Sequence, residues 1–260
     1  MPHIRPQILV DTGLLLSDLG ILDAQNAEIC GVAIKTIRRW RRLYQRQGRM
    51  RGQAANYAPC PRCGDGVLDR AAYAELLGWY LGDGHIAWSG ARRIPLLAIF
   101  NDAKYADLNA HLIHLMAAVK PGGSPHQRRM PGAIATACGW KHWPCLFPQH
   151  GPGRKHKRAI VLAPWQQQIV EQHPGRFLRG LFHSDGCRIT NWTTRPVRGG
   201  VKRYEYPRYF FSNASADIRG LCCWALGLLD IAHTHPSERT ISVARKEAVA
   251  VLDVHVGPKS

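Results

Sequence analysis

Apolar residues recur with a helical period near the start of the chain. An apolar cluster fills residues 13–22, and a second set follows in which Ile37, Trp40 and Leu43 return every three residues. Basic residues occupy the remaining faces of this second segment. The pattern predicts a small helical domain over residues 1–50.

The periodic pattern then breaks. Gly48 to Gly66 is rich in glycine, proline and polar residues and has no sustained apolar period. Such composition is typical of a connection between domains. We therefore predict a linker over residues 51–68, with a second domain beginning at residue 69.

The second domain is predicted to contain two similar halves, residues 69–172 and 173–260. In each half a helix ending in an Asp-Gly pair is followed by a β-like stretch with arginines and aromatic residues, an apolar helix and a further strand. The expected helices and late strands are Ala71–Gly84, Ala106–Val119 and Ala133–Ala137 in the first half, and Gly175–Gly186, Ala216–Leu229 and Thr240–Ala244 in the second. The repeated order favours an internal duplication.

The two Asp-Gly helix ends carry the clearest candidate chemistry. Gly78 and Gly82 lie four residues apart on one helix, as Gly180 and Ser184 do on the other. Small residues at this spacing let two helices cross closely. The crossing would bring together Asp83 and Asp185, which lie 102 positions apart, and their mutual repulsion would favour a divalent cation.

The glycines that follow these aspartates, Gly84 and Gly186, are predicted to be left-handed C-caps. The plainer alternative is that each Gly-Asp-Gly or Ser-Asp-Gly segment merely stops a helix and starts a turn.

The paired helix ends resemble the two motifs of the monomeric LAGLIDADG homing endonuclease family, over roughly Tyr73 to Val256. The resemblance implies an α+β fold of two αββαββα repeats whose antiparallel sheets follow the DNA major groove. It also implies that Asp83 and Asp185 bind Mg²⁺ for phosphodiester cleavage. Arg179 is an unusual second residue for this motif, although that position can face outward.

A basic side chain usually assists such cleavage. Lys141 and Lys246 follow the late strand of each half and are our candidates, with Arg245 as a rival to Lys246.

Residues 26–40 resemble the helix-turn-helix of resolvases and many bacterial regulators. Gly31 would form the turn, and Val32 would be buried in it. Side chains expected to contact DNA from the second helix are Lys35, Thr36, Arg38, Arg39 and Arg42. The alternative is a basic helical hairpin that touches only phosphate or packs on the second domain.

Net charge supports a polyanionic partner. The 260 residues carry a formal charge of +17, and no acidic residue occurs from Leu108 to Val170. Neutralised phosphates release counterions, which favours binding of a basic protein to nucleic acid. A second predicted phosphate-binding set comprises Arg154, Lys155, Lys157 and Arg158.

The chain has eight cysteines, and two of them form a Cys-Pro-Arg-Cys-Gly segment at Cys60 and Cys63. Two thiolates on one tight turn look like a zinc knuckle, which is half of a Zn²⁺ site. The remaining ligands would come from elsewhere, for example Cys138, His142 or Cys145. A turn without metal is the alternative.

The sequence has no signal-peptide pattern and no apolar run long enough to span a membrane, so we expect a cytoplasmic, nucleoid-associated protein. Two motifs in one chain imply that a monomer suffices. The favoured function is a Mg²⁺-dependent endonuclease acting on double-stranded DNA. The alternatives are a non-cleaving helix-turn-helix transcriptional regulator on the same scaffold and an RNA maturation cofactor.

Overall fold

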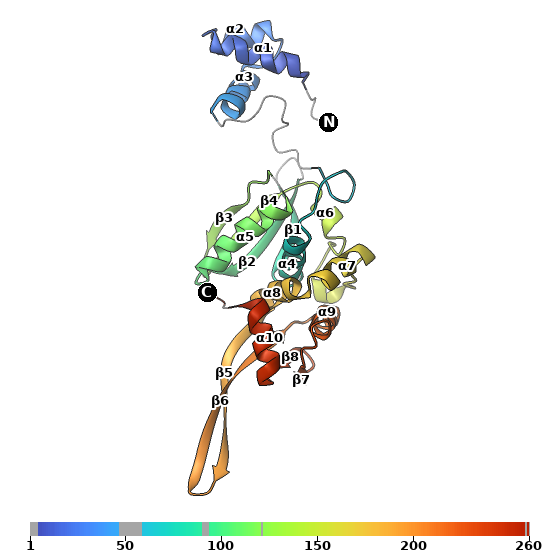
Figure 1. Cartoon of the computed structure of the whole chain (residues 1–260). Coiled ribbons are helices and arrows are strands. Elements are labelled where there is room, and N and C mark those ends of the chain that lie inside the picture. The colour runs from blue at the N-terminus through green and yellow to red at the C-terminus, as the bar shows by residue number, and fades with distance from the viewer. Residues whose placement is uncertain (1–4, 47–58, 90–93, 121, 258, 260) are drawn as a thin grey trace. The chain divides into compact units, whose positions relative to one another are not determined.

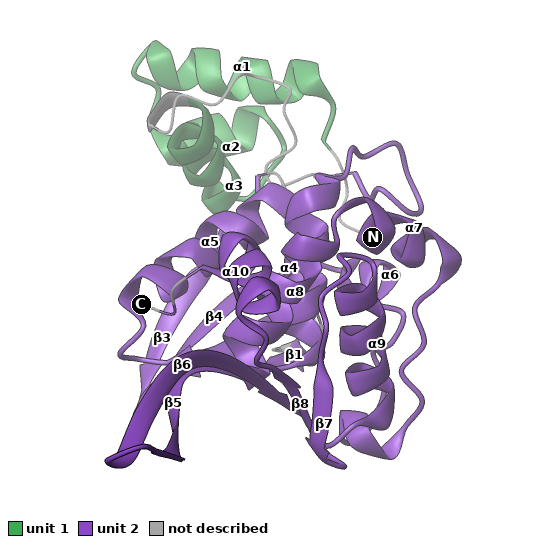
Figure 2. Cartoon of the chain, turned by 60° about the horizontal axis from the view of Figure 1, so that its bottom comes forward, with its two compact units in different colours: residues 1–57 green, residues 58–260 purple. Residues whose placement is uncertain are grey.

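A computed structural model describes residues 5–46, 59–89, 94–120, 122–257 and 259. The chain divides into two units, residues 1–57 and 58–260, which are distinguished by colour in Figure 2. Of the expected linker, residues 51–58 lie outside the described part. Among the described residues, no helix is long and apolar enough to cross a membrane.

The described part of unit 1 is helical, and its elements are α1 (Gln7–Asp18), α2 (Asp23–Ile29), α3 (Ile34–Trp40) and a π-helical extension η1 (Arg41–Arg46). Ile37 and Trp40 on α3 are buried against Leu14 on α1. Gly13 makes this contact close, because a Cβ there would lie 2.8 Å from Trp40 Cζ3.

The turn between α2 and α3 has the geometry expected of a helix-turn-helix. Gly31 adopts a φ of 59°, a left-handed conformation that glycine reaches without strain. Val32 is half-buried and packs against the core of unit 1. The expected turn at Gly31 is therefore confirmed, with Val32 less completely buried than predicted.

Unit 2 contains the order αββαββα twice. The first repeat consists of α4 (Arg70–Leu81), β1 (Gly84–Ser89), β2 (Ile94–Asp102), α5 (Ala106–Val119), β3 (His126–Met130), β4 (Ala133–Gly139), a short α6 (Trp143–Leu146), a 3-10 turn η2 (Lys155–Lys157) and α7 (Pro164–Gln172). The second consists of α8 (Pro174–Asp185), β5 (Gly186–Val197), β6 (Gly200–Ser212), α9 (Ala216–Gly227), β7 (Thr234–Ser237), β8 (Thr240–Val243) and α10 (Lys246–Val256). The fold class expected from the sequence is confirmed.

Each repeat forms a four-stranded antiparallel sheet, in the orders β1-β2-β4-β3 and β5-β6-β8-β7. The first strand of each sheet begins immediately after its motif helix, with Gly84 paired to Ile99 and Gly186 paired to Phe211. In Figure 2 strands β5 and β6 curve beneath helices α8 and α10. Alternating residues of β2, such as Leu97 and Ile99, are fully buried.

Helices α4 and α8 cross at the centre of unit 2, where two glycines meet. A Cβ on Gly180 would lie 2.8 Å from the Trp79 nitrogen and 3.0 Å from Gly78 Cα. A Cβ on Gly78 would lie 2.8 Å from the Leu181 nitrogen. Every residue of α4 from Ala72 to Leu81 is buried, and Glu75 is the one charged residue among them. The close crossing predicted from the glycine spacing is thus present.

A buried carboxylate ties α4 to its neighbours. Glu75 has no exposed surface, and its oxygens lie 2.6 Å from His111 Nε2 and 2.9 Å from Arg176 Nη2. Arg179 Nε lies 3.4 Å from the same carboxylate, and its Nη1 donates to the Val256 carbonyl at 2.7 Å. Burial raises the pKa of Glu75, but these cationic partners outweigh it and hold the pKa below its usual value. Arg179 therefore faces the core network and not, as the sequence allowed, the solvent.

The predicted left-handed caps at Gly84 and Gly186 were wrong. Neither residue has a positive φ; Gly186 has φ −106° and ψ 165°, because the chain passes straight from helix into an extended strand. Glycine is required here because a Cβ would collide with the preceding helical turn, and not because the backbone is left-handed. A Cβ on Gly186 would lie 2.7 Å from Phe182 Cα.

Substituting alanine at Gly180 tests the crossing. Its Cβ would meet backbone atoms of α4, which cannot rotate away, so we expect the free energy of unfolding to fall by roughly 3 kcal/mol. The matched control is Gly220→Ala on α9, where a Cβ meets nothing within 4 Å; it should be neutral or stabilise by about 0.5–1 kcal/mol. Urea unfolding measures both, and equal effects at the two sites would contradict the crossing.

Candidate functional site

The crossing brings the C-terminal ends of α4 and α8 together, and each end carries an aspartate. Asp83 directly follows the C-cap Gly82, and Asp185 is the last residue of α8. A Cβ on Gly82 would lie 3.1 Å from Asp185 Oδ2 and would overlap Ser184. The two carboxylates thus share one region, as the motif pair implied.

The environment of the pair opposes its negative charge. Burial raises the pKa of Asp83 to about 6, and the negative charge of Asp185 contributes to the rise. Burial also raises the pKa of Asp185, although Asn213 Nδ2 donates to its Oδ2 at 2.6 Å and partly offsets this. The nearby cationic side chains therefore do not fully offset burial, to which the negative ends of the helix dipoles add.

A lysine closes the end of α4. Lys155 Nζ donates to three backbone carbonyls, those of Tyr80 at 2.6 Å, Gly82 at 2.5 Å and Gly84 at 3.0 Å. Burial lowers the pKa of this ammonium to about 8, while the charges of the two aspartates oppose that shift. The helix C-terminus is a favourable place for a cation.

A second lysine occupies the matching position at the end of α8. Lys259 Nζ donates to the carbonyls of Ser184 at 3.4 Å and Gly186 at 3.3 Å. These two carbonyls correspond in the second repeat to those of Gly82 and Gly84. Burial lowers the pKa of Lys259 as well. The two repeats thus place one lysine each beside the aspartate pair.

The predicted assisting lysines, Lys141 and Lys246, are not among the groups whose charges act on the aspartates. Lys141 follows β4, and its charge acts on the Cys63 thiol. Lys246 is the first residue of α10. The lysines whose charges act on both Asp83 and Asp185 are Lys155 and Lys259.

The basic run of residues 154–158 borders the aspartates. A hollow of about 370 Å³ is lined by Asp185, Asn213, Arg154 and Lys155, among others. Arg154 and Lys157 are exposed, whereas Arg158 Nη1 donates to the Gly153 carbonyl at 2.7 Å. Lys155 is predicted from the sequence only as one phosphate contact of this run, and no pattern in the sequence distinguishes it from its basic neighbours. Lys259 carried no sequence signal either.

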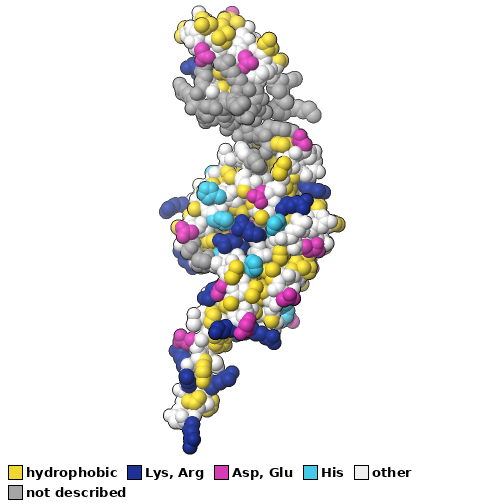
Figure 3. Space-filling model, viewed as in Figure 1, with side chains coloured by type: hydrophobic (Ala, Val, Ile, Leu, Met, Phe, Trp, Pro, Cys, Tyr) yellow, Lys and Arg dark blue, Asp and Glu magenta, His cyan; other side chains and the backbone are white. Residues whose placement is uncertain are grey.

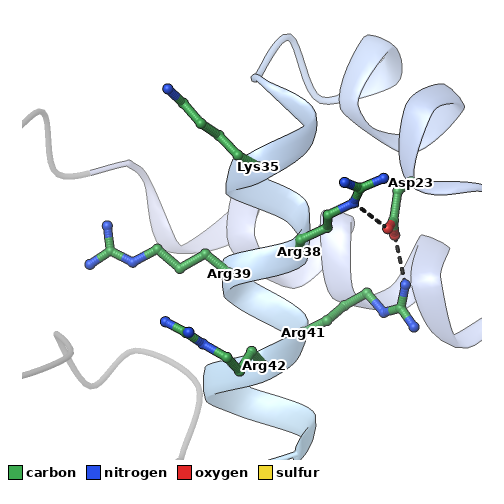
Figure 4. Close-up of a pocket in the computed structure, with 6 residues that line it drawn as sticks. All are labelled: Asp23, Lys35, Arg38, Arg39, Arg41 and Arg42. Carbon is green, nitrogen blue, oxygen red and sulfur yellow. Dashed lines mark hydrogen bonds and ion pairs between the residues drawn. The ribbon is translucent and has the colours of Figure 1, made fainter.

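The predicted DNA-contacting helix presents a basic surface on unit 1. A hollow of about 560 Å³ is lined by Asp23, Lys35, Arg38, Arg39, Arg41 and Arg42 (Figure 4). The Asp23 carboxylate forms ion pairs with Arg41 Nη1 at 2.7 Å and with Arg38 Nε at 3.2 Å. Lys35, Arg39 and Arg42 point away from Asp23, and Thr36 is half-buried.

Strands β5 and β6 form a long two-stranded arm that extends beyond the rest of unit 2 (Figure 1). Lys and Arg side chains occur along the arm to its tip (Figure 3). Trp192 is 55% exposed and lies under the Arg203 guanidinium, with 4.8 Å between Arg203 Cζ and the centre of the Trp192 ring. Arginines and aromatic residues in this stretch are evident from the sequence, but their pattern predicted no role for them.

The predicted zinc-knuckle cysteines lie beside two further soft ligands. Ligand atoms of Cys60, Cys63, His142 and Cys145 all lie within 4.8 Å of one another. Cys138 is buried in the core on β4 and is not part of this group.

No protein-family model and no curated protein matches the chain. Among solved structures, it is similar to variants of the homing endonuclease I-DmoI at 11% identity and a TM-score of 0.49, over 73% of this chain and 97% of that one. The LAGLIDADG meganuclease I-AabMI bound to uncleaved DNA is similar at 8% identity and a TM-score of 0.45, over 70% and 83% of the two chains. The N-terminal LAGLIDADG domain of DUF199/WhiA is similar at 14% identity and a TM-score of 0.43, over 74% and 83%.

Likeness at such identities concerns the fold alone. Within this chain, the αββαββα order occurs twice, and the two motif helices cross at their glycines. Unit 2 has a LAGLIDADG-type fold.

Proposed function

We propose that this chain binds double-stranded DNA in a sequence-specific manner and cleaves it in a Mg²⁺-dependent reaction at Asp83 and Asp185. The observation that carries the proposal is the pair of aspartates at the crossed helix ends, buried enough to raise the pKa of both. Placing two carboxylates in this way destabilises the folded chain, and a divalent cation would relieve the repulsion between them.

The donor set fits magnesium. Carboxylate oxygens are hard ligands of the kind Mg²⁺ prefers, and the hollow beside Asp185 leaves room for retained waters or phosphate. When bound, the metal would supply Lewis-acid activation of the phosphate and of a water nucleophile. The chain itself would contribute the positions of the two carboxylates, and Asn213 would hold Asp185 in one orientation through its amide.

Lys155 and Lys259 would place positive charge beside the reacting phosphate. Each ammonium is fixed by backbone carbonyls and is therefore preorganised, which lowers the cost of stabilising developing charge. Lys141 and Lys246 remain predictions from the sequence. We favour Lys155 and Lys259 because their charges already act on both aspartates.

The DNA would lie along the strand face of unit 2. The arm has 12 residues in β5 and 13 in β6. At about 3.3 Å per residue it reaches roughly 40 Å, a little more than one turn of duplex DNA. Arg195 and Lys202 are paired across the arm, and both are suited to phosphate or guanine contacts. In the described residues the corresponding strands of the first repeat are shorter, with 6 residues in β1 and 9 in β2. The target therefore need not be palindromic, and a monomer would suffice.

A non-cleaving transcriptional regulator is the second candidate function. The basic surface on α3 favours it, because a dedicated DNA-reading unit adds sequence recognition that cleavage does not require. In that case the two aspartates would be remnants of the scaffold.

Cleavage of a randomised duplex library with Mg²⁺ distinguishes the two candidates. We expect discrete cuts from the parent chain, and loss of cleavage by roughly 1000-fold or more from Asp83→Asn/Asp185→Asn, because several kcal/mol of charge stabilisation disappear. Lys155→Met should slow cleavage far more than Lys141→Met without weakening binding. Sequence-specific binding with no cuts by any protein would reject the endonuclease and support the regulator.

Asp83→Asn should stabilise the chain in a pH-dependent manner. The pKa of Asp83 is raised from 3.8 to about 6 in the folded state, so the unfolded chain loses this proton first as pH rises. The carboxylate therefore destabilises the fold increasingly between pH 4 and 6 and constantly above it. We expect the variant to gain on the order of 2 kcal/mol at pH 8 and nothing below pH 4. Thermal unfolding at several pH values measures this; a gain that is independent of pH would contradict the shift.

The salt dependence of binding tests the surface of α3. Replacing Lys35, Arg39 and Arg42 together by alanine should lower the slope of log affinity against log salt by about 0.9 for each lost phosphate contact. Arg5→Ala, an exposed arginine before α1, is the control and should leave the slope nearly unchanged. Fluorescence anisotropy at several salt concentrations provides the slope. Identical slopes for the parent and triple variant would show that α3 does not contact DNA.

A further inference from the structure

We propose that Cys60, Cys63, His142 and Cys145 bind one structural zinc ion in unit 2, separate from the aspartate pair. The site would be closed, with three thiolates and one imidazole. This set of four ligands is typical of structural zinc, whereas catalytic sites keep a position open.

The ligand spacing fits tetrahedral zinc. With Zn–S of about 2.3 Å and Zn–N of about 2.0 Å, neighbouring sulfur and nitrogen atoms in a tetrahedron lie about 3.6 Å apart. His142 Nδ1 lies 3.2 Å from Cys63 Sγ and 3.7 Å from Cys145 Sγ. All four ligand atoms lie within 4.8 Å of one another, so small side-chain adjustments would complete the coordination.

The first two ligands are held by a tight turn. The Arg62 backbone N–H donates to Cys60 Sγ at 3.4 Å, and the Arg62 guanidinium lies 4.5 Å from the centre of the Trp165 ring. A Cβ on Gly64 would lie 3.2 Å from the Cys60 carbonyl, so the turn needs a small residue there. The two thiols therefore face the same point without reorganisation of the backbone.

The other two ligands are held by an aromatic segment. The His142 ring meets Trp140 edge-on, with centroids 5.4 Å apart. Trp143 is fully buried, and its indole N–H donates to the Cys138 carbonyl at 2.7 Å. This anchoring places His142 and Cys145 on the surface facing the cysteine turn. The side chain of Cys138 belongs to the core, which explains why it is not a ligand.

Zinc here would join two distant parts of the chain. Cys63 and His142 are separated by 79 positions. The first pair immediately precedes α4, which ends at Asp83, and the second pair opens the segment that carries Lys155. A metal cross-link of this kind lowers the conformational entropy of the unfolded chain. It also holds in place the two segments that lead to the aspartate pair.

A metal explains the cluster better than a disulfide. All three thiols are free in the structure, and any one disulfide would leave the third thiol and the histidine unused. The ligands are soft sulfur and imidazole, which select zinc over magnesium. The group is thus chemically distinct from the oxygen ligands of the aspartate pair.

Zinc content of the purified full-length chain tests the proposal. We expect inductively coupled plasma mass spectrometry to find zinc in the parent chain. Cys63→Ser and Cys145→Ser should each contain one zinc ion per chain fewer than the parent. The matched control is Cys223→Ser, a half-buried cysteine whose Sγ lies 3.7 Å from His235 Nε2 in a three-ligand group with His233. This variant should retain the ion that depends on Cys63.

Cobalt substitution and thermal unfolding complete the test without any DNA substrate. Co²⁺ in the parent should show tetrahedral d–d bands and strong thiolate charge transfer. Stripping the zinc with a chelator should lower the Tm of unit 2, and Zn²⁺ but not Mg²⁺ should restore it. A parent that contains no zinc and gains no stability from added Zn²⁺ would overturn the proposal, even if the variants fail to fold. Zinc retained by Cys145→Ser and lost from Cys223→Ser would also overturn it. These readouts do not depend on DNA cleavage.

Discussion

The close approach of α4 and α8 is the constraint on which the rest of unit 2 depends. Gly78 and Gly180 let the two backbones touch, and no larger side chain fits between them. The crossing sets the relation between the two sheets, because each first strand leaves directly from its motif helix. It also decides that the two helix ends, with their carboxylates, share one place. The packing of the two helices and the approach of the two aspartates therefore both depend on the absence of a Cβ atom at these glycines.

Bringing like charges together has an energetic consequence that the neighbouring residues only partly offset. Helix dipoles and burial disfavour ionised Asp83 and Asp185, whereas Lys155 and Lys259 supply compensating charge from opposite repeats. The lysines bind backbone carbonyls and so cannot fully neutralise the carboxylates. This balance is typical of a site that is less stable than its surroundings and is completed by a ligand.

The two repeats have diverged around this shared centre. The second repeat carries the long β5–β6 arm with its exposed arginines and aromatics, while the first carries the inserted segment after β4. Cys145 and Lys155 both belong to that insertion, so one stretch of chain would serve the proposed zinc ion and the aspartate pair.

The sequence alone determined the features that depend on local periodicity: the order of elements, the duplicated helix ends and the turn at Gly31. It gave Lys155 only as one of several phosphate contacts and did not give Lys259, because a lysine becomes a helix-end cation only when distant segments fold against that helix. At Gly186 an extended strand begins in place of the expected left-handed cap, because pairing in the sheet outweighed the local preference of glycine. Likewise, only the tertiary structure separated Cys145 from Cys138, because burial in the core, and not spacing along the chain, decides which thiol can reach a metal.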